Sequence, residues 1–112
     1  MSSHSEVGTE IAGIRIPGDL ADNLIPVAQL TPNDWNPNKM DRFMAERLER
    51  AIQKDGFTTP ILVRPAHGRL DEGGNPVSYE IVDGEHRWRT AKQLGMSDVP
   101  IVNLGDIPDD QA

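Results

Sequence analysis

Five consecutive residues, Asp83 to Arg87, bring together groups that can bind phosphate. Arg87 offers a planar fork of donors to phosphate oxygens, and His86 adds a donor that gains a charge near neutral pH. Gly84 has no Cβ atom, so a ligand can approach the backbone closely. An apolar run precedes these residues and a helical pattern follows them, and unpaired N–H groups at a helix start favour anions. The sequence predicts phosphate binding by Gly84, Glu85, His86 and Arg87.

Glu85 is unexpected at an anion site, because its carboxylate repels phosphate. A carboxylate that holds Mg²⁺ against phosphate oxygens would explain it. Glu85 is therefore the candidate catalytic and metal-binding residue, with Mg²⁺ bound together with a nucleotide. A structural explanation is equally simple: Asp83 caps the helix, and Glu85 favours the helix dipole and pairs with Arg89 four residues on. The residues alone leave both explanations open.

Two further segments carry groups that could contact a base or ribose. The four candidates are Asn36, Asn38, Thr58 and Thr59. Such amides and hydroxyls also cap helices and satisfy local backbone, so both roles stay open. If they do bind a ligand, Arg87 should point into a concave site that it forms with residues 33–39 and 58–60.

The composition narrows the class of protein. A chain of 112 residues supports one domain with one hydrophobic core. It contains no cysteine, which excludes thiol catalysis, disulfides and thiolate metal sites. It lacks a stretch of about 18 apolar residues that could span a membrane, and its N-terminus lacks the pattern of a secretory signal. We therefore expect a cytoplasmic protein without a membrane partner.

The charge distribution bears on the partner. The formal net charge is −7, yet residues 36–104 carry ten charges of each sign. The excess acidity thus belongs to the two ends of the chain. A neutral central part lacks the broad basic surface that drives binding to a nucleic-acid backbone. The charges therefore disfavour a DNA partner but are compatible with one phosphorylated small molecule.

Apolar periodicity and turn residues predict the elements that must position these side chains. Residues 1–13 are polar and are predicted to form a flexible leader, followed by a single domain over 14–112. The expected elements are strands at 23–30, 60–64, 77–82 and 99–104 and helices at 40–54 and 85–94. This order predicts an α/β (α+β) fold with a small mixed sheet and two main helices.

The same periodicity predicts which side chains are buried. The first helix should bury Met44, Leu48, Ala51 and Ile52. The second should bury Trp88, Ala91 and Leu94. Along the strand at 77–82, one face should carry Tyr79 and Ile81, and the other Ser78, Glu80 and Val82.

Several motifs in this order resemble the N-terminal domain of ParB partition proteins, over roughly residues 23–107. They include Gly56-Phe57-x-x-Pro60-Ile61-x-Val63 and the run Gly84-Glu85-His86-Arg87-Trp88-Arg89, which is similar to the family's Gly-Glu-Arg-Arg-x-Arg. The resemblance implies a ParB/sulfiredoxin fold. It also implies that residues 84–87 grip the phosphates of CTP, and that residues 58–60 recognise the base.

The chain departs from the family pattern in ways that affect these roles. His86 stands where ParB proteins have arginine, which removes one charge from the phosphate grip. The second phosphate motif and the helix-turn-helix of ParB would follow Ala112. Sulfiredoxins have cysteine where this chain has Glu85, so sulfinic-acid repair is excluded. The Asp-Gly-Glu-His-Arg variant resembles ParB-like domains of phages and mobile elements.

These features predict a ParB-like domain that binds CTP or ATP with Mg²⁺. One alternative is a ParB-like nuclease or DNA-binding protein. Others are a phosphotransferase, and a degenerate protein-interaction domain that kept the fold and lost the ligand. Whether the domain is an enzyme is left open among a nucleoside triphosphatase, a nuclease and a phosphotransferase. A homodimer or a protein partner is compatible with each of these functions.

Overall fold

The computed structural model describes residues 8–32, 41–71 and 73–106. Its elements are β1 (Thr9–Ile11), β2 (Ile14–Ile16), α1 (Gly18–Ala21), β3 (Leu24–Pro26), the 3-10 helix η2 (Val27–Gln29), β4 (Leu30–Pro32), α2 (Arg42–Asp55), β5 (Ile61–Pro65), β6 (Tyr79–Asp83), α3 (Glu85–Gln93) and β7 (Asp98–Asn103).

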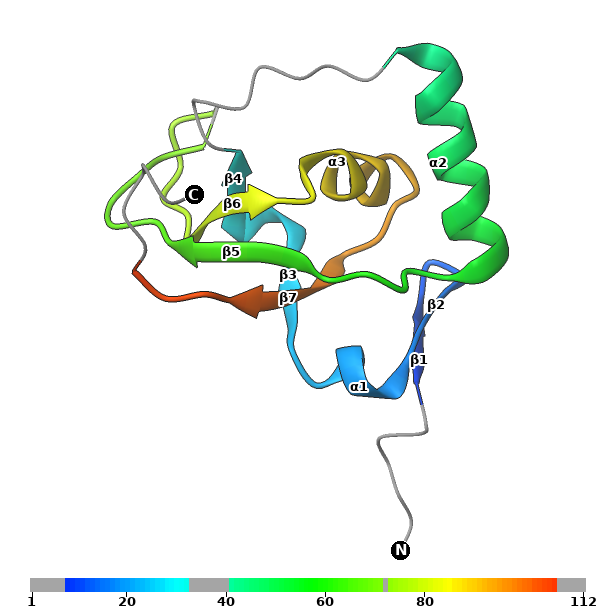
Figure 1. Cartoon of the computed structure of the whole chain (residues 1–112). Helices are drawn as coiled ribbons and strands as arrows, with labels where there is room; N and C mark the ends of the chain where they lie inside the picture. Colours follow the sequence, from blue (N-terminus) through cyan, green and yellow to red (C-terminus); the bar gives the residue numbers. More distant parts are fainter. Residues whose placement is uncertain (1–7, 33–40, 72, 107–112) are drawn as a thin grey trace, which may run out of the picture.

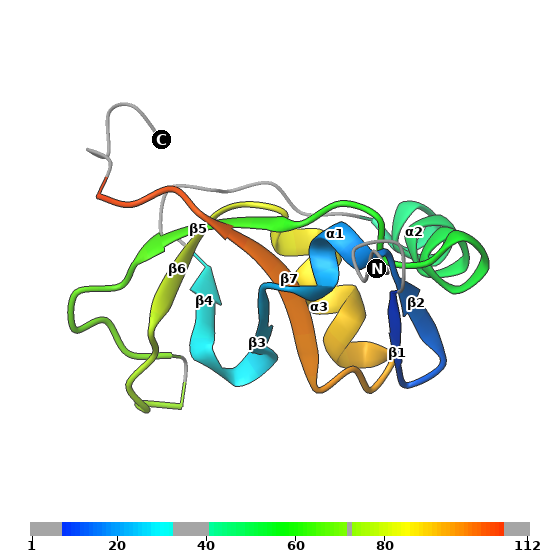
Figure 2. The ribbon, with the colours of Figure 1, turned by 90° about the horizontal axis from the view of Figure 1, so that it is seen from below.

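Five of the strands form one mixed sheet in the order β3-β7-β5-β6-β4, and β1 and β2 form a separate hairpin. Helix α3 contacts β5 and η2, and α2 contacts α3 and β2 at one end of the molecule (Figure 1). The view from below shows how strongly the sheet curls (Figure 2). The predicted mixed α/β fold with two main helices is confirmed. No helix in the described ranges is both long and apolar enough to cross a bilayer.

The two long helices begin and end for local reasons that the sequence contains. The Asp41 carboxylate accepts a hydrogen bond from the Met44 N–H at 2.8 Å, which caps the start of α2. Gly56, with φ of 93°, ends that helix in a conformation that favours glycine. Gly95, with φ of 85°, follows α3 in the same way. The predicted helices at 40–54 and 85–94 are thus close to the observed ones, although residue 40 lies outside the described residues.

Two predictions about the first 30 residues need correction. Residues 9–13 belong to the β1–β2 hairpin and not to a flexible leader, while residues 1–7 lie outside the described residues. Ala12 and Gly13 both have positive φ, as a tight hairpin turn of this handedness requires. The hairpin places Ile14 and Ile16 in the core.

The segment at 23–30 is also not one strand. β3 pairs antiparallel with β7 at one edge of the sheet, whereas β4 pairs parallel with β6 at the other edge. Only the three residues of η2 connect β3 to β4. Because so short a link joins the two edges, the sheet must curl until they lie near each other.

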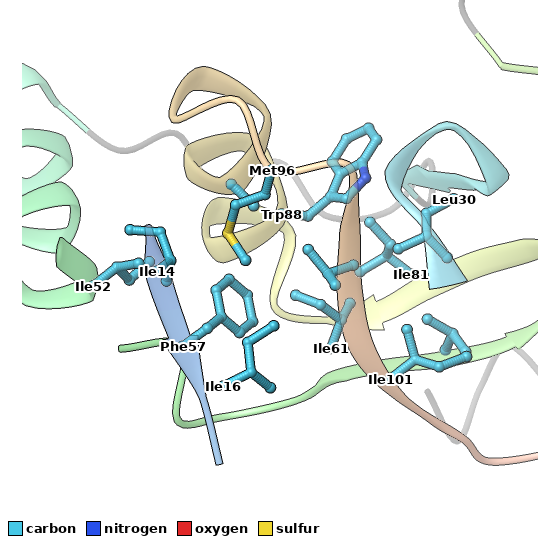
Figure 3. Packing of buried hydrophobic residues seen from close by; sticks show 13 residues of the cluster. Ile14, Ile16, Leu30, Ile52, Phe57, Ile61, Ile81, Trp88, Met96 and Ile101 are labelled. Carbon is cyan, nitrogen blue, oxygen red and sulfur yellow. The ribbon is translucent and has the colours of Figure 1, made fainter. Parts of the chain in front are cut away.

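The hydrophobic core lies between the sheet, α3, α2 and the hairpin, and Figure 3 shows its main side chains. Trp88 is 5% exposed, and its indole Nε1 donates to the Val27 carbonyl at 3.0 Å. Ala91 is fully buried and Leu94 packs against the same cluster, so the predicted stripe of α3 is confirmed.

The predicted stripe of α2 is only half correct. Ile52 is buried and Leu48 packs against the core, but Met44 is 48% exposed and Ala51 is exposed. The reason is tertiary: α2 meets the rest of the molecule chiefly through α3 and β2, which cover one narrow side of the helix. Apolar spacing alone does not reveal how wide a side the neighbours cover.

A buried carboxylate lies on the face of the sheet opposite the core. Glu80, predicted on the face opposite Ile81, is 3% exposed. Glu80 accepts a hydrogen bond from Arg64 Nε at 2.7 Å and forms an ion pair with Arg69 Nη1 at 3.1 Å. Arg69 Nη2 also donates to the Pro32 carbonyl at 3.5 Å. A buried charge is tolerated only with such partners, so Arg69 ties the connection after β5 to β6 and to the end of β4.

Trp88 provides a test of this packing. Trp88→Ala should lower the free energy of unfolding by about 3–5 kcal/mol, because it removes a large core side chain. Trp88→Phe should cost less, about 1–3 kcal/mol, since the ring volume largely remains and the Val27 carbonyl loses its donor. Chemical denaturation followed by circular dichroism measures both values. A Trp88→Ala cost below that of Trp88→Phe would contradict the packing described here.

Candidate phosphate-binding site

Sheet topology brings three segments together at one end of the strands. β6 leads directly into α3, and its last residue, Asp83, lies opposite Leu62 near the start of β5. β4 runs parallel to β6, with Pro32 opposite Ile81. The start of β5, the end of β4 and the start of α3 therefore meet at the same place. The end of a sheet strand beside a helix N-terminus is a common position for ligands in α/β folds.

Gly84 makes the sharp turn between β6 and α3. Its φ of 102° and ψ of 18° lie in the left-handed region, which favours glycine. A Cβ atom at this position would lie 3.1 Å from Arg87 Nη2 and 3.2 Å from Ile61 Cδ1. The Gly84 carbonyl accepts the first helical hydrogen bond, from the Trp88 N–H at 3.0 Å. The turn thus needs glycine both for its backbone and for the space beside it.

The Arg87 guanidinium lies against this turn. Its Nη2 donates to the Pro60 carbonyl at 3.4 Å, which joins the start of α3 to the segment before β5. Its Nε atom is buried and has no hydrogen-bond partner among the described residues. A buried donor without an acceptor is costly. Arg87 contacts Pro60, one of the residues predicted beside it, whereas the predicted contribution of residues 33–39 lies outside the described residues.

Glu85 is engaged with its neighbour on α3. Its Oε2 accepts from Arg89 Nε at 2.9 Å, and its side chain is 11% exposed. This is the pairing that the structural explanation of Glu85 predicted. The helix cap, however, is Gly84, and the Asp83 residue is exposed. Within the described residues, no group of three or more His, Cys, Asp or Glu side chains could hold a metal ion.

Of the remaining predicted contact residues, three lie within the described residues and two lie outside them. Thr58 and Thr59 are both exposed and directly precede Pro60, while the buried Phe57 anchors them to the core. His86 is half-buried, and its carbonyl accepts from Thr90 Oγ1 at 2.8 Å within the helix. Asn36 and Asn38 lie outside the described residues.

Two contacts near this site were not predicted from the sequence. One is the Pro60 carbonyl that holds Arg87, and the other is the link from Glu80 through Arg69 to Pro32. A residue pattern cannot predict that a backbone carbonyl accepts a hydrogen bond from Arg87. An alternating strand pattern also suggests that Glu80 is exposed to solvent. Both follow from tertiary contacts.

The ParB N-terminal domain family matches residues 17–112 of the chain. The chain belongs to this family. A probable chromosome-partitioning protein ParB of Vibrio cholerae is 40% identical over 84 residues, covering 74% of this chain and 25% of the relative. The chain thus spans about a quarter of the length of that ParB protein.

Solved structures agree with this family assignment. The truncated ParB of Caulobacter crescentus complexed with CTP-gamma-S superposes with a TM-score of 0.64 at 33% identity, covering 78% of this chain and 45% of that one. A free serine kinase in complex with AMP gives 0.59 at 26% identity, covering 78% and 32%. Sulfiredoxin from Arabidopsis thaliana, at 18% identity, 74% and 85% coverage and a TM-score of 0.57, shares the fold alone.

Two glycine variants separate backbone strain from crowding at the Gly84 turn. Gly95→Ala should cost about 1–2 kcal/mol, because alanine resists positive φ but meets no atom within 4 Å. Gly84→Ala should cost a further ~1–3 kcal/mol, since its Cβ also crowds Arg87 and Ile61. Equal costs in denaturant titrations would show that the space beside Gly84 is not tightly packed.

Proposed function

We propose that this domain binds a nucleotide, CTP or ATP, with its phosphates at the start of α3. The observation that carries the proposal is Arg87, whose buried Nε lacks a partner among the described residues and whose Nη2 is fixed on Pro60. A guanidinium held in this way is oriented before the ligand arrives, so little side-chain entropy is lost on binding. The ParB neighbour complexed with CTP-gamma-S supports the ligand class.

The phosphate end of the proposed site combines backbone and side-chain donors. The first N–H groups of α3 point out of the helix start, and His86 and Arg87 follow in the first turn. Glu85 is neutralised by Arg89, so the Arg87 charge is not cancelled by its neighbour. One arginine grips a polyphosphate less strongly than two do. We therefore expect weak binding.

The base and ribose end lies next to Pro60 in this proposal. Thr59 and Thr58 are exposed and stand one and two residues before Pro60, whose carbonyl holds Arg87. Asn36 and Asn38, which lie outside the described residues, are the further base or ribose contacts in this proposal. The domain would act in the cytoplasm, where nucleotides are available.

Mg²⁺ would be held mainly by the nucleotide's own phosphates, because the described residues contain no cluster of metal ligands. Glu85 fits as one protein ligand, since Arg89 occupies its Oε2 and leaves Oε1. Magnesium sites of this kind commonly use one or two carboxylates plus phosphate oxygens. The ion would neutralise phosphate charge that Arg87 alone does not balance.

A second candidate is phosphoryl transfer from ATP to a small hydroxyl compound. The free serine kinase neighbour in complex with AMP, at 26% identity, favours it. In this case Glu85 would act beside the phosphate as the catalytic residue. Formation of ADP that requires a hydroxyl acceptor, with free serine as the first one tested, would distinguish transfer from binding or simple hydrolysis.

Calorimetric titration with CTP and ATP, with and without Mg²⁺, tests the proposal. Arg87→Ala should weaken the affinity by about 10- to 100-fold, because it removes a charge-assisted hydrogen bond worth about 1.5–3 kcal/mol. Arg50→Ala, which removes the same charge from an exposed position on α2, should leave the affinity unchanged. Arg69→Ala is unsuitable as the control, because Arg69 supports Glu80 and Pro32.

The outcomes are distinct. An unchanged affinity in Arg87→Ala would refute the site while leaving nucleotide binding intact. Wild-type protein that binds neither nucleotide would instead support a degenerate interaction domain.

A further inference from the structure

The outward side of α2 carries an aromatic residue followed by three cations. They are Phe43, Arg47, Arg50 and Lys54, and we call them the α2 stripe. Spacings of four, three and four residues place them on one side of a helix, over about 16 Å of its length. The opposite side, with Leu48 and Ile52, packs on the core. The stripe therefore faces away from the core. Helix α2 itself lies at one end of the domain (Figure 1).

All four residues of the stripe are exposed, and Phe43 is 62% exposed. Arg47 lies over the Phe43 ring with its Cζ 5.7 Å from the centroid. Within the described ranges, no carboxylate forms an ion pair with Arg47, Arg50 or Lys54, although the same helix contains Glu46 and Glu49. The three charges are thus available to an external anion, and the aromatic ring extends the line that they form.

We propose that the α2 stripe binds the backbone of a single-stranded nucleic acid. Cations three or four residues apart on a helix lie about 5–6 Å from one another, which suits successive phosphates of one strand. Arginine forks fit phosphate oxygens, and an exposed aromatic ring at the end of a basic track gives a base a surface on which to stack. An acidic polypeptide would use the charges but gain nothing comparable from Phe43.

The interaction is weak and electrostatic. The chain has a net charge of −7, so only the local field of the stripe attracts a polyanion. Three phosphate contacts with a single strand correspond to a slope of about −2 for log affinity against log salt concentration. The stripe is separate from the start of α3, so strand binding does not require the nucleotide site.

Fluorescence anisotropy with a labelled oligothymidylate at about 20 mM NaCl, where screening is weak, tests the inference. Arg50→Glu and Lys54→Glu should each weaken binding about tenfold or more, because a phosphate contact becomes a repulsion. Arg42→Glu is the matched control: it makes the same charge change on an exposed residue of the same helix, away from the stripe. It should change the affinity by about twofold at most. Phe43→Ala should weaken binding about fivefold or more through lost stacking.

Two further measurements exclude a contribution from the nucleotide site and a loss of folding. Arg87→Ala should bind the oligonucleotide as wild type does, which keeps this result independent of the nucleotide site. Circular dichroism should show unchanged folding in the exposed-residue variants. The proposal is overturned if wild-type protein does not bind at low salt, or if Arg42→Glu is as harmful as Arg50→Glu. It is also overturned if a labelled oligoglutamate of equal charge binds more tightly than the oligonucleotide.

Discussion

The indole of Trp88 packs inside the curled sheet and donates to the Val27 carbonyl in the short link between β3 and β4. This contact fixes α3 against the sheet at the point where the two sheet edges are joined. Since α3 follows β6 after a single glycine, fixing the helix also fixes where its first turn lies. The position of Gly84 and Arg87 relative to β5 therefore depends on the packing of a side chain that does not itself line the site.

The curl of the sheet has a second consequence. β4 and β6 run parallel and end at the same edge, while β5 begins there in the opposite direction. Three chain segments far apart in sequence thus contribute their ends to one place, where a helix also begins. Strand ends and helix starts expose backbone groups that the sheet and helix do not use. This edge is where the fold can bind a polar ligand without breaking its own hydrogen bonds.

Three arginines show how context decides the role of a side chain. Arg64 and Arg69 both form ion pairs with the buried Glu80, so their charges stabilise that carboxylate within the sheet. Arg87 is held by a neutral carbonyl and keeps a buried nitrogen without a partner among the described residues. Arg64 and Arg69 share the Glu80 carboxylate as an ion-pair partner, whereas Arg87 has no ion-pair partner among the described residues. Arg87 is for this reason the better candidate for binding an anion.

The sequence by itself determined the features that depend on neighbouring residues. The Asp41 cap, the glycine that ends α2 and the buried stripe of α3 all rest on local hydrogen bonds, backbone preference or helical periodicity. Only the tertiary structure decided which edges of the sheet receive β3 and β4, that Glu80 is buried, and that Met44 is exposed. These features depend on segments that are distant in the chain. The burial of a side chain is set by the element that packs against it, and a local residue pattern does not predict which element that is.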